Sequence, residues 1–308
     1  MAGPMMFAGT SAALALLVPL PVMQESGPPA AQIEVVQAER DGHARLTVPV
    51  RIGENGTFRF LIDTGAERTV LSRDVANRLG LVPNGSAILM GVAGSQRVEL
   101  VEVDEIGLGR RSFTSLSAPL LENHHIGADG IIGLDSLQGQ RVLLDFGHNR
   151  IAVDDARTLG GNAGYEIVVK ARRRSGQLIM TNALVGGVRT DIIIDTGAET
   201  SIGNLALQRA LAMRDRVSPA TLISVTGQEV VADSGRVSTI KVGRIVLNDT
   251  LLAFTDAPPF RQLGLHRRPA ILLGMNQLRL FKRIAIDFST RRIFFDLPDD
   301  ARDHISRD

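Results

Sequence analysis

From residue 33 onward, the apolar residues of the chain alternate with polar ones or gather in short runs. Runs of this length, bounded by Gly, Asn and Ser, are typical of β-strands. The clearest predicted strands cover residues 46–52, 58–63, 98–106, 141–146 and 191–196. Short turn-forming groups between the runs predict hairpin turns at residues 54–56, 110–111, 186–187 and 248–249. We therefore expect a mainly antiparallel β-fold.

Two segments have the spacing of amphipathic helices instead. One covers residues 72–80 and opens at Ser72, and the other covers residues 204–214 and opens at Asn204. Ser and Asn are favoured N-cap residues because their side chains accept hydrogen bonds from the first N–H groups of a helix. Both segments come shortly after the same six-residue motif, which indicates an internal repeat.

The repeated motif is Ile-Asp-Thr-Gly-Ala-Glu, at residues 62–67 and again at residues 194–199. Its aspartates, Asp63 and Asp195, lie 132 positions apart, which is 195 less 63. In each copy, two strands and a turn lead into the motif. A short helix, a glycine-containing apolar stretch and a pair of strands follow it. The order and the spacing both match, so the chain is predicted to consist of two similar units.

Each unit closes with two apolar residues and a glycine, Gly133 or Gly274, before a last strand. These glycines lie 141 positions apart, 274 less 133, so the second unit carries about nine extra residues. We place them in the loop 258–269, since exposed loops tolerate insertions best. The predicted organisation is an N-terminal lobe at 32–155, a linker at 156–164, a C-terminal lobe at 165–298 and a polar tail at 299–308.

The first 24 residues differ from the rest because none of them is charged, and residues 7–23 are a mostly apolar run of 17. Pro19 and Pro21 would interrupt a buried helix at this place. We therefore expect residues 1–31 to be a signal peptide or an N-terminal anchor plus linker. A basic start and a clear cleavage site are both missing, so both readings stay open. The protein is then exported, periplasmic or secreted, or tethered to a membrane through residues 7–23.

Composition excludes several classes of function. Lys and Arg number 34 against 33 Asp and Glu, so the formal charge of +1 offers no basic excess for nucleic acid. The absence of Cys removes thiolate metal sites and a thiol nucleophile. His124 and His125 come without any further ligand motif, so we predict no metal and no other cofactor. The motifs of serine hydrolases and of phosphate-binding loops are also missing.

The paired Asp-Thr-Gly-Ala motifs and the apolar-apolar-Gly segments resemble those of the aspartic proteases, a family that includes pepsin and the retroviral proteases. The resemblance covers almost all of residues 40–298. It implies the acid protease fold, with two similar β-barrel-like lobes related by a pseudo-two-fold axis and few short helices. Both lobes in one chain are similar to the pepsin plan. Ala66 and Ala198, followed by Glu67 and Glu199, resemble the retroviral plan.

The resemblance implies that Asp63 and Asp195 form a catalytic dyad. Two carboxylates at about 3 Å share one proton, because ionising both is costly. The ionised member would take a proton from a water, while the protonated member polarises the scissile carbonyl. Residues expected to support the dyad are Thr64, Gly65, Ala66, Thr196, Gly197 and Ala198. Because Ala offers no hydroxyl donor to the carboxylates, we expect a pH optimum of roughly 4–6.

Two flaps are expected over the cleft, from residues 90–98 and 223–231, with Gly91 and Gly94 as hinges of the first. The flap tyrosine of pepsin is missing, since Tyr165 is the only tyrosine and lies near the linker. A peptide or protein substrate would lie extended and pair with the flaps as an added strand. The residues assigned to flaps and substrate binding are Gly91, Val92, Gly94, Val225 and Gly227.

Two functions remain open at this point. The first is an endopeptidase that works as a monomer, with its two lobes forming a pseudo-dimer. The second is a peptide-binding module on the same fold that captures an extended segment without cutting it. A pure binder would not need both aspartates, both threonines and both glycines of the motifs, so their retention favours the enzyme.

Overall fold

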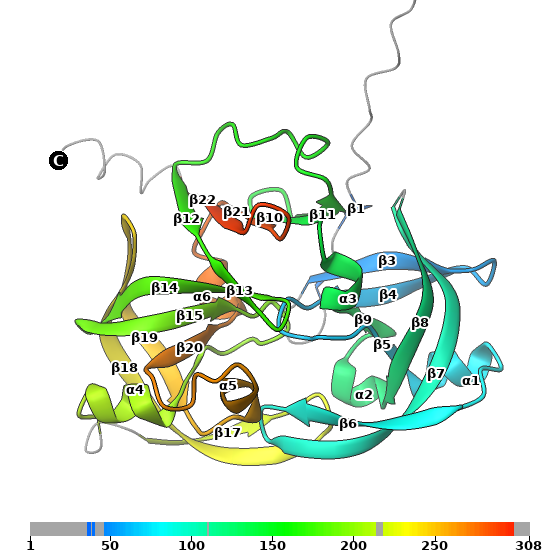
Figure 1. The fold of residues 1–308 in the computed structure, drawn as a ribbon, viewed down its shortest axis with the longest axis horizontal. Coiled ribbons are helices and arrows are strands. Elements are labelled where there is room, and N and C mark those ends of the chain that lie inside the picture. The colour runs from blue at the N-terminus through cyan, green and yellow to red at the C-terminus, as the bar shows by residue number, and fades with distance from the viewer. Residues whose placement is uncertain (1–35, 38, 41–45, 110, 214–217, 299–308) are drawn as a thin grey trace, which may run out of the picture. The chain divides into compact units, whose positions relative to one another are not determined.

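The computed structural model describes residues 36–37, 39–40, 46–109, 111–213 and 218–298 (Figure 1). Strands dominate this part of the chain, together with six short helices. The expected mainly β fold is confirmed. The predicted signal or anchor segment and the polar tail 299–308 lie outside the described residues. No helix within the described ranges is long and apolar enough to cross a membrane.

The first copy of the repeat forms an eight-stranded sheet in the order β2-β3-β4-β9-β5-β8-β7-β6. A further pairing of β3 with β7 curls this sheet on itself. Its strands are β2 (Glu39–Arg40), β3 (Leu46–Ile52), β4 (Thr57–Ile62), β5 (Val70–Ser72), β6 (Gly85–Gly91), β7 (Gly94–Leu108), β8 (Arg111–Leu121) and β9 (Gly130–Ile132). Its helices are α1 (Arg73–Arg78), α2 (Asn123–Ile126) and α3 (Leu134–Leu137).

The second copy forms another eight-stranded sheet, in the order β13-β14-β15-β20-β16-β19-β18-β17, which β14 and β18 curl in the same way. Its strands are β13 (Arg172–Arg174), β14 (Gln177–Val185), β15 (Val188–Ile194), β16 (Ile202–Gly203), β17 (Ser218–Ile223), β18 (Glu229–Val242), β19 (Ile245–Phe254) and β20 (Ala270–Leu273). Its helices are α4 (Leu205–Ala210), α5 (Pro258–Gln262) and α6 (Met275–Leu278). The two strand orders correspond one to one, as expected for two similar lobes.

A third sheet takes strands from both copies, in the order β1-β11-β10-β21-β22-β12. Its strands are β1 (Val36–Gln37), β10 (Arg141–Asp145), β11 (Arg150–Asp154), β12 (Ile167–Lys170), β21 (Arg283–Asp287) and β22 (Arg292–Asp296). Where β10 meets β21, a buried ion pair joins Arg141 to Asp287 at 2.7 Å. Because each partner belongs to a different copy, this pair fixes one lobe to the other.

Both predicted helices form, and each starts as the sequence indicates. The hydroxyl of Ser72 accepts from the N–H of Val75 at 3.2 Å, at the start of α1. The side chain of Asn204 accepts from the N–H of Leu207 at 2.9 Å, at the start of α4. Helix α1 follows directly after β5, and α4 follows directly after β16. These are the first strands after the two motifs, so each capped helix fixes the end of such a strand.

One predicted turn is wrong. Residues 248–249 lie inside β19, and the hairpin between β18 and β19 turns at residues 243–244 instead. Asp249 does have a left-handed φ of 46°, a conformation that Asp tolerates better than most residues. This conformation interrupts the strand's pairing locally rather than ending it. The turn at Gly186 and Gly187 is confirmed, because both glycines have positive φ between paired strands.

The predicted insertion in the second copy falls in the expected loop. Eight residues, 122–129, join β8 to β9, whereas fifteen, 255–269, join β19 to β20. The shorter connection carries α2 and the longer one carries α5. In α5, Phe260 is fully buried in an apolar cluster of the second lobe. The inserted residues are therefore a packed part of that lobe.

Candidate active site

Each motif follows a strand that pairs in parallel with the strand leading to the closing glycine. Strand β4 pairs with β9, and β15 pairs with β20. The N–H of Asp63 donates to the carbonyl of Ile132 at 3.0 Å, and the N–H of Asp195 donates to that of Leu273 at 3.0 Å. The two aspartates therefore leave their strands at equivalent points of the two lobes.

The closing glycines are needed because the motif loops pass directly against them. A Cβ at Gly133 would collide with the backbone of Arg68, and one at Gly274 would stand 2.9 Å from the carbonyl oxygen of Ala198. The residue after each glycine donates its N–H to the motif loop, to Ala66 or to Ala198, at 2.9 Å in both lobes. The apolar-apolar-Gly segments therefore hold the loops that carry the aspartates.

Backbone N–H groups of each loop point at its own carboxylate. Gly65 and Ala66 donate to Oδ1 of Asp63 at 2.7 and 3.1 Å. In the second loop, Gly197 and Ala198 donate to Oδ1 of Asp195, both at 3.1 Å. Each carboxylate is thereby fixed through one oxygen. These hydrogen bonds also favour the charged form of each group.

The two loops meet across the lobes at their glycines. A Cβ at Gly65 would stand 2.7 Å from Oδ1 of Asp195, and a Cβ at Gly197 would stand 2.6 Å from Oδ1 of Asp63. Each carboxylate thus lies against the glycine of the opposite loop, and only a residue without a side chain fits there. The aspartates are largely buried, with exposed fractions of 9% and 8%. The structure brings the two predicted catalytic residues together.

Thr64 and Thr196 link the loops through buried hydrogen bonds. The N–H of Thr64 donates to Oγ1 of Thr196 at 3.0 Å, and the N–H of Thr196 donates to Oγ1 of Thr64 at 3.3 Å. The hydroxyl of Thr64 donates to the carbonyl of Ile194 at 2.8 Å, and that of Thr196 to the carbonyl of Ile62 at 2.6 Å. Each threonine therefore reaches into the opposite strand, which sets the separation of the carboxylates.

The dyad carries a proton at neutral pH. Burial and, after it, the neighbouring charge of Asp63 raise the pKa of Asp195 to about 8, although the N–H groups of Ala198 and Gly197 act to lower it. Two buried carboxylates in contact titrate as a pair, so this pKa describes the loss of the second proton. The pair therefore loses its last proton only near pH 8.

Two hairpins lie at the positions where the flaps are expected, and they are called flaps below. Strands β6 and β7 form the first, with a tip at residues 91–94, and β17 and β18 form the second, with a tip at residues 224–228. Gly91 and Gly94 pair with each other at the tip, so they are tip residues and not hinges at the base. A side chain at Gly91 would collide with the hydroxyl of Ser224, so the two tips are in contact.

Each flap tip packs on the opposite lobe. Val92 of the first flap packs against a cluster of the second lobe, called here the β15 cluster: Ile179, Ile193, Ile202, Ala257, Phe260, Leu263, Leu265, Ala270 and Leu272. Val225 of the second flap packs against the β4 cluster of the first lobe: Leu61, Val70, Val98, Leu121, Ile126, Ala128 and Ile131. Gly227 lies so close to the ring of His125 that a side chain there would collide with it.

Two contacts at the site were not predicted from the sequence. The side-chain amide of Gln177 donates to the carbonyl of Gly65 at 2.8 Å, and that of Gln262 donates to Glu67 at 2.6 Å. Both glutamines belong to the second copy and reach the motif loop of the first. Neither lies in a repeated motif, so no signal in one sequence marks them. The rings of His124 and His125 on α2 are tilted by 55° with centroids 4.0 Å apart, and no group of acidic and histidine residues in the described ranges is arranged to hold a metal.

Comparison with protein families agrees with this geometry. Residues 48–136 and 181–277 match the model of the aspartyl protease family, once in each lobe. The two matches cover more than half of the chain, and each includes one Asp-Thr-Gly-Ala motif and its closing glycine. The chain belongs to the aspartyl protease family. A comparison with curated proteins found no match.

Proposed function

We propose that the protein is an aspartic endopeptidase that hydrolyses peptide bonds with a water activated between Asp63 and Asp195. The observation that carries this proposal is the crossed packing of the loops, in which each carboxylate lies against the glycine of the opposite lobe. Neither lobe alone has two carboxylates in this arrangement. The raised pKa of Asp195 gives the pair the single proton that the reaction requires.

The proposed reaction begins with a water held between the two carboxyl groups. The ionised carboxylate takes a proton from this water while the protonated one donates a hydrogen bond to the scissile carbonyl. The water oxygen bonds to the carbonyl carbon while the protonated carboxyl transfers its proton to the carbonyl oxygen, and a tetrahedral diol results. The carboxyl that took the water proton then gives it to the leaving nitrogen, and the other carboxylate takes a proton from one diol hydroxyl. The C–N bond breaks, a carboxylic acid and an amine form, and the dyad again holds one proton. The backbone N–H groups on each Oδ1 keep the carboxylates oriented throughout.

The proposed substrate is an extended segment of a peptide or protein, bound between the dyad and the flaps. The flap tips touch each other through Gly91 and Ser224, so they have to separate before a polypeptide can enter. The β4 and β15 clusters flank the motif loops, and Ala66 packs on the first of them. We therefore expect a preference for apolar side chains on both sides of the cleaved bond.

The state and the location of the enzyme are part of the proposal. Both carboxylates come from one chain, so a monomer has a complete dyad and we propose that it acts as a pseudo-dimer. The apolar run at residues 7–23 supports export, with the segment either removed or retained as a membrane tether. Nucleic acid is not proposed as a partner, because the chain has no basic excess.

The test is hydrolysis of a mixed peptide library between pH 3 and 8 by the wild type, Asp63→Asn and Asp195→Asn. A matched control is Asp104→Asn, since this aspartate is exposed on β7. We expect both dyad variants to lose cleavage and the control to keep it. Cleavage that survives both dyad substitutions would show that another site does the work. Peptide binding by a wild type that cuts nothing would favour the non-catalytic peptide-binding module.

A further inference from the structure

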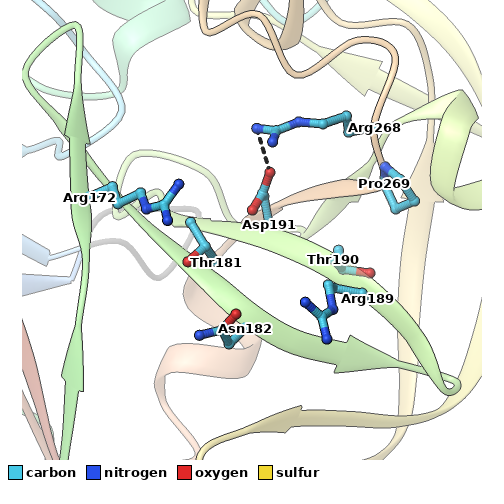
Figure 2. Close-up of a pocket in the computed structure, with 8 residues that line it drawn as sticks. All are labelled: Arg172, Thr181, Asn182, Arg189, Thr190, Asp191, Arg268 and Pro269. Carbon is cyan, nitrogen blue, oxygen red and sulfur yellow. Dashed lines mark ion pairs between the residues drawn. The ribbon is translucent and has the colours of Figure 1, made fainter.

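A second polar site lies in the C-terminal lobe, away from the flaps. It is a cavity of about 340 Å³ over the hairpin β14–β15 (Figure 2). Seven of its eight lining residues are polar or charged, and the eighth is a proline: Arg172, Thr181, Asn182, Arg189, Thr190, Asp191, Arg268 and Pro269. Three guanidinium groups and one carboxylate meet here, so the cavity has a positive excess although the whole chain is nearly neutral.

One of the cationic side chains, that of Arg268, is held in place by the fold. Arg268 forms an ion pair with Asp191 at 2.8 Å, drawn in Figure 2, and Asp191 is only 8% exposed. The side-chain amide of Asn204, which caps α4, donates to the carbonyls of Leu265 and Arg268, at 2.9 and 2.6 Å. Arg268 is therefore fixed at both its backbone and its side chain. Such fixing lowers the entropy lost when a ligand binds.

The other two arginines leave donors available to a ligand. Arg172 extends towards Asp191 from β13, on the other side from Arg268. Within the described part of the chain, the guanidinium of Arg189 makes no hydrogen bond or ion pair. Burial raises the pKa of Asp191, and the charges of Arg268 and Arg172 oppose this rise. One carboxylate therefore faces more positive charge than it neutralises.

The cavity sits on a distortion that only the second lobe has. The pairing of β14 with β15 shifts register between Met180 and Ala183, so Thr181 and Asn182 bulge out of the ladder. In the first lobe, β3 and β4 pair without a shift from Thr47 to Arg51. A β-bulge redirects side chains and is often found next to functional sites. The fold itself does not need this one, because the first lobe forms without it.

Three of the four charges of the cavity have no matching charge in the first copy, whereas Arg172 has Arg40 as its counterpart by the offset of the repeat. By the 132-residue offset of the repeat, the first copy has Thr57 where the second has Arg189, and Arg59 where the second has Asp191. Arg268 lies in the connection from β19 to β20, which has fifteen residues where the first copy has eight. Bulge, arginines and inserted loop therefore combine in one lobe to build a site that the duplicated fold does not supply.

We propose that this cavity binds a carboxylate-bearing segment of a polypeptide and so selects acidic protein substrates. Guanidinium groups suit carboxylates because their N–H donors match both oxygens. Asp191 precedes Asp195 by four residues of strand, or about 13 Å. An extended substrate spans that distance with about four residues, so the acidic segment would lie at least four residues from the cleaved bond. The part played by the substrate rests on the proposed peptidase function.

The test measures binding without catalysis, by fluorescence anisotropy of labelled tetraglutamate and tetraglutamine on the full chain carrying Asp195→Asn. The pocket variant is Arg172→Gln with Arg189→Gln. Its control, Arg150→Gln with Arg173→Gln, removes the same charge from exposed arginines outside the cavity. We expect tetraglutamate to bind, tetraglutamine not to bind, and the pocket variant to weaken tetraglutamate at least tenfold. The control should change its affinity less than twofold.

Equal binding by the pocket variant and its parent, or an equal loss in pocket and control variants, overturns the proposal. Inorganic phosphate separates the two sources of an anion. Competition by phosphate with bound tetraglutamate, lost in the pocket variant, supports the site, whereas phosphate binding without any tetraglutamate binding overturns the polypeptide ligand. If the wild type cleaves no peptide but the pocket binds tetraglutamate as expected, the binding site stands and the peptidase function fails.

Discussion

The crossed contact between each glycine and the opposite carboxylate gives a graded prediction. Replacing Gly197 by Ala adds a Cβ that would stand 2.6 Å from Oδ1 of Asp63 and closer still to its other carboxyl atoms. Ordinary contact begins at 3.4 Å, so the carboxylate has to move by more than about 0.8 Å, which is 3.4 less 2.6. Replacing Gly65 by Ala requires Asp195 to move by about 0.7 Å, since its nearest atom would stand at 2.7 Å.

A displacement of about 1 Å in a catalytic group costs roughly 100-fold in rate. We therefore expect Gly197→Ala to lower kcat/KM by about 100-fold or more, and Gly65→Ala to lower it by about 10-fold or more. Overpacking of this kind also destabilises by about 1–3 kcal/mol. Because native proteins are typically stable by about 5–15 kcal/mol, we expect the variants to fold and their activity to be measurable at a temperature well below unfolding.

The assay compares kcat/KM on one cleaved peptide and the thermal midpoint for both variants and for Gly147→Ala. At Gly147, a Cβ would stand 3.5 Å or more from its neighbours, so this control should change neither quantity. The reasoning fails if Gly197→Ala keeps kcat/KM within about threefold of the wild type, because the carboxylate would then have room that the structure denies it.

Three further predictions concern the proton of the dyad and the joints between the lobes. The pKa of Asp195 is raised in the folded state, so its stabilising contribution is complete below about pH 4 and is lost as pH rises to about 8. Chemical denaturation across this range should show a decline of up to about 1.4 kcal/mol per pH unit that Asp195→Asn removes and Asp104→Asn keeps. Thr196→Val leaves the N–H of Thr64 and the carbonyl of Ile62 without the hydroxyl that they bond. It should lower the free energy of unfolding in urea by roughly 2–4 kcal/mol, and Thr196→Ser should retain most of that stability. Arg141→Met leaves Asp287 buried without its partner and should cost about 3–5 kcal/mol by the same measurement, and a loss below about 1 kcal/mol would contradict the ion pair's role.

The repeat explains why so much of the fold could be predicted from the sequence. Strand periodicity, the Ser72 and Asn204 caps, and the glycines of the turn 186–187 are local signals, and each has its expected place in the structure. The wrong turn at residues 248–249 shows the limit of such signals. Asp249 takes the left-handed conformation of a turn residue, but the long ladder of β18 and β19 continues past it.

The candidate site was predictable as far as the motifs extend and no further. Asp63 and Asp195 are marked by an identical six-residue context. Gln177, Gln262 and the cavity over β14 depend on contacts between segments that lie far apart in the sequence. A one-residue bulge and a single unpaired arginine do not change the hydrophobic pattern of a sequence. Only the folded structure shows that they lie close together.

The two lobes are most alike in the loops that carry Asp63 and Asp195, and they differ most at the outer end of the second lobe. The hydrogen bonds that hold Asp63 and Asp195 to their closing segments have the same length in both lobes, 3.0 Å, and so do those from the closing segments to Ala66 and Ala198, 2.9 Å. The shared proton that we propose accounts for this equality, because displacing either carboxylate changes the environment of both. The outer end of β15 carries no such demand, since it lies about 13 Å from the dyad along the strand. One copy could therefore acquire a bulge, an inserted loop and a group of arginines at this end without disturbing the proposed dyad. The outer end of the second lobe is for this reason the part of the fold best able to acquire a preference among substrates.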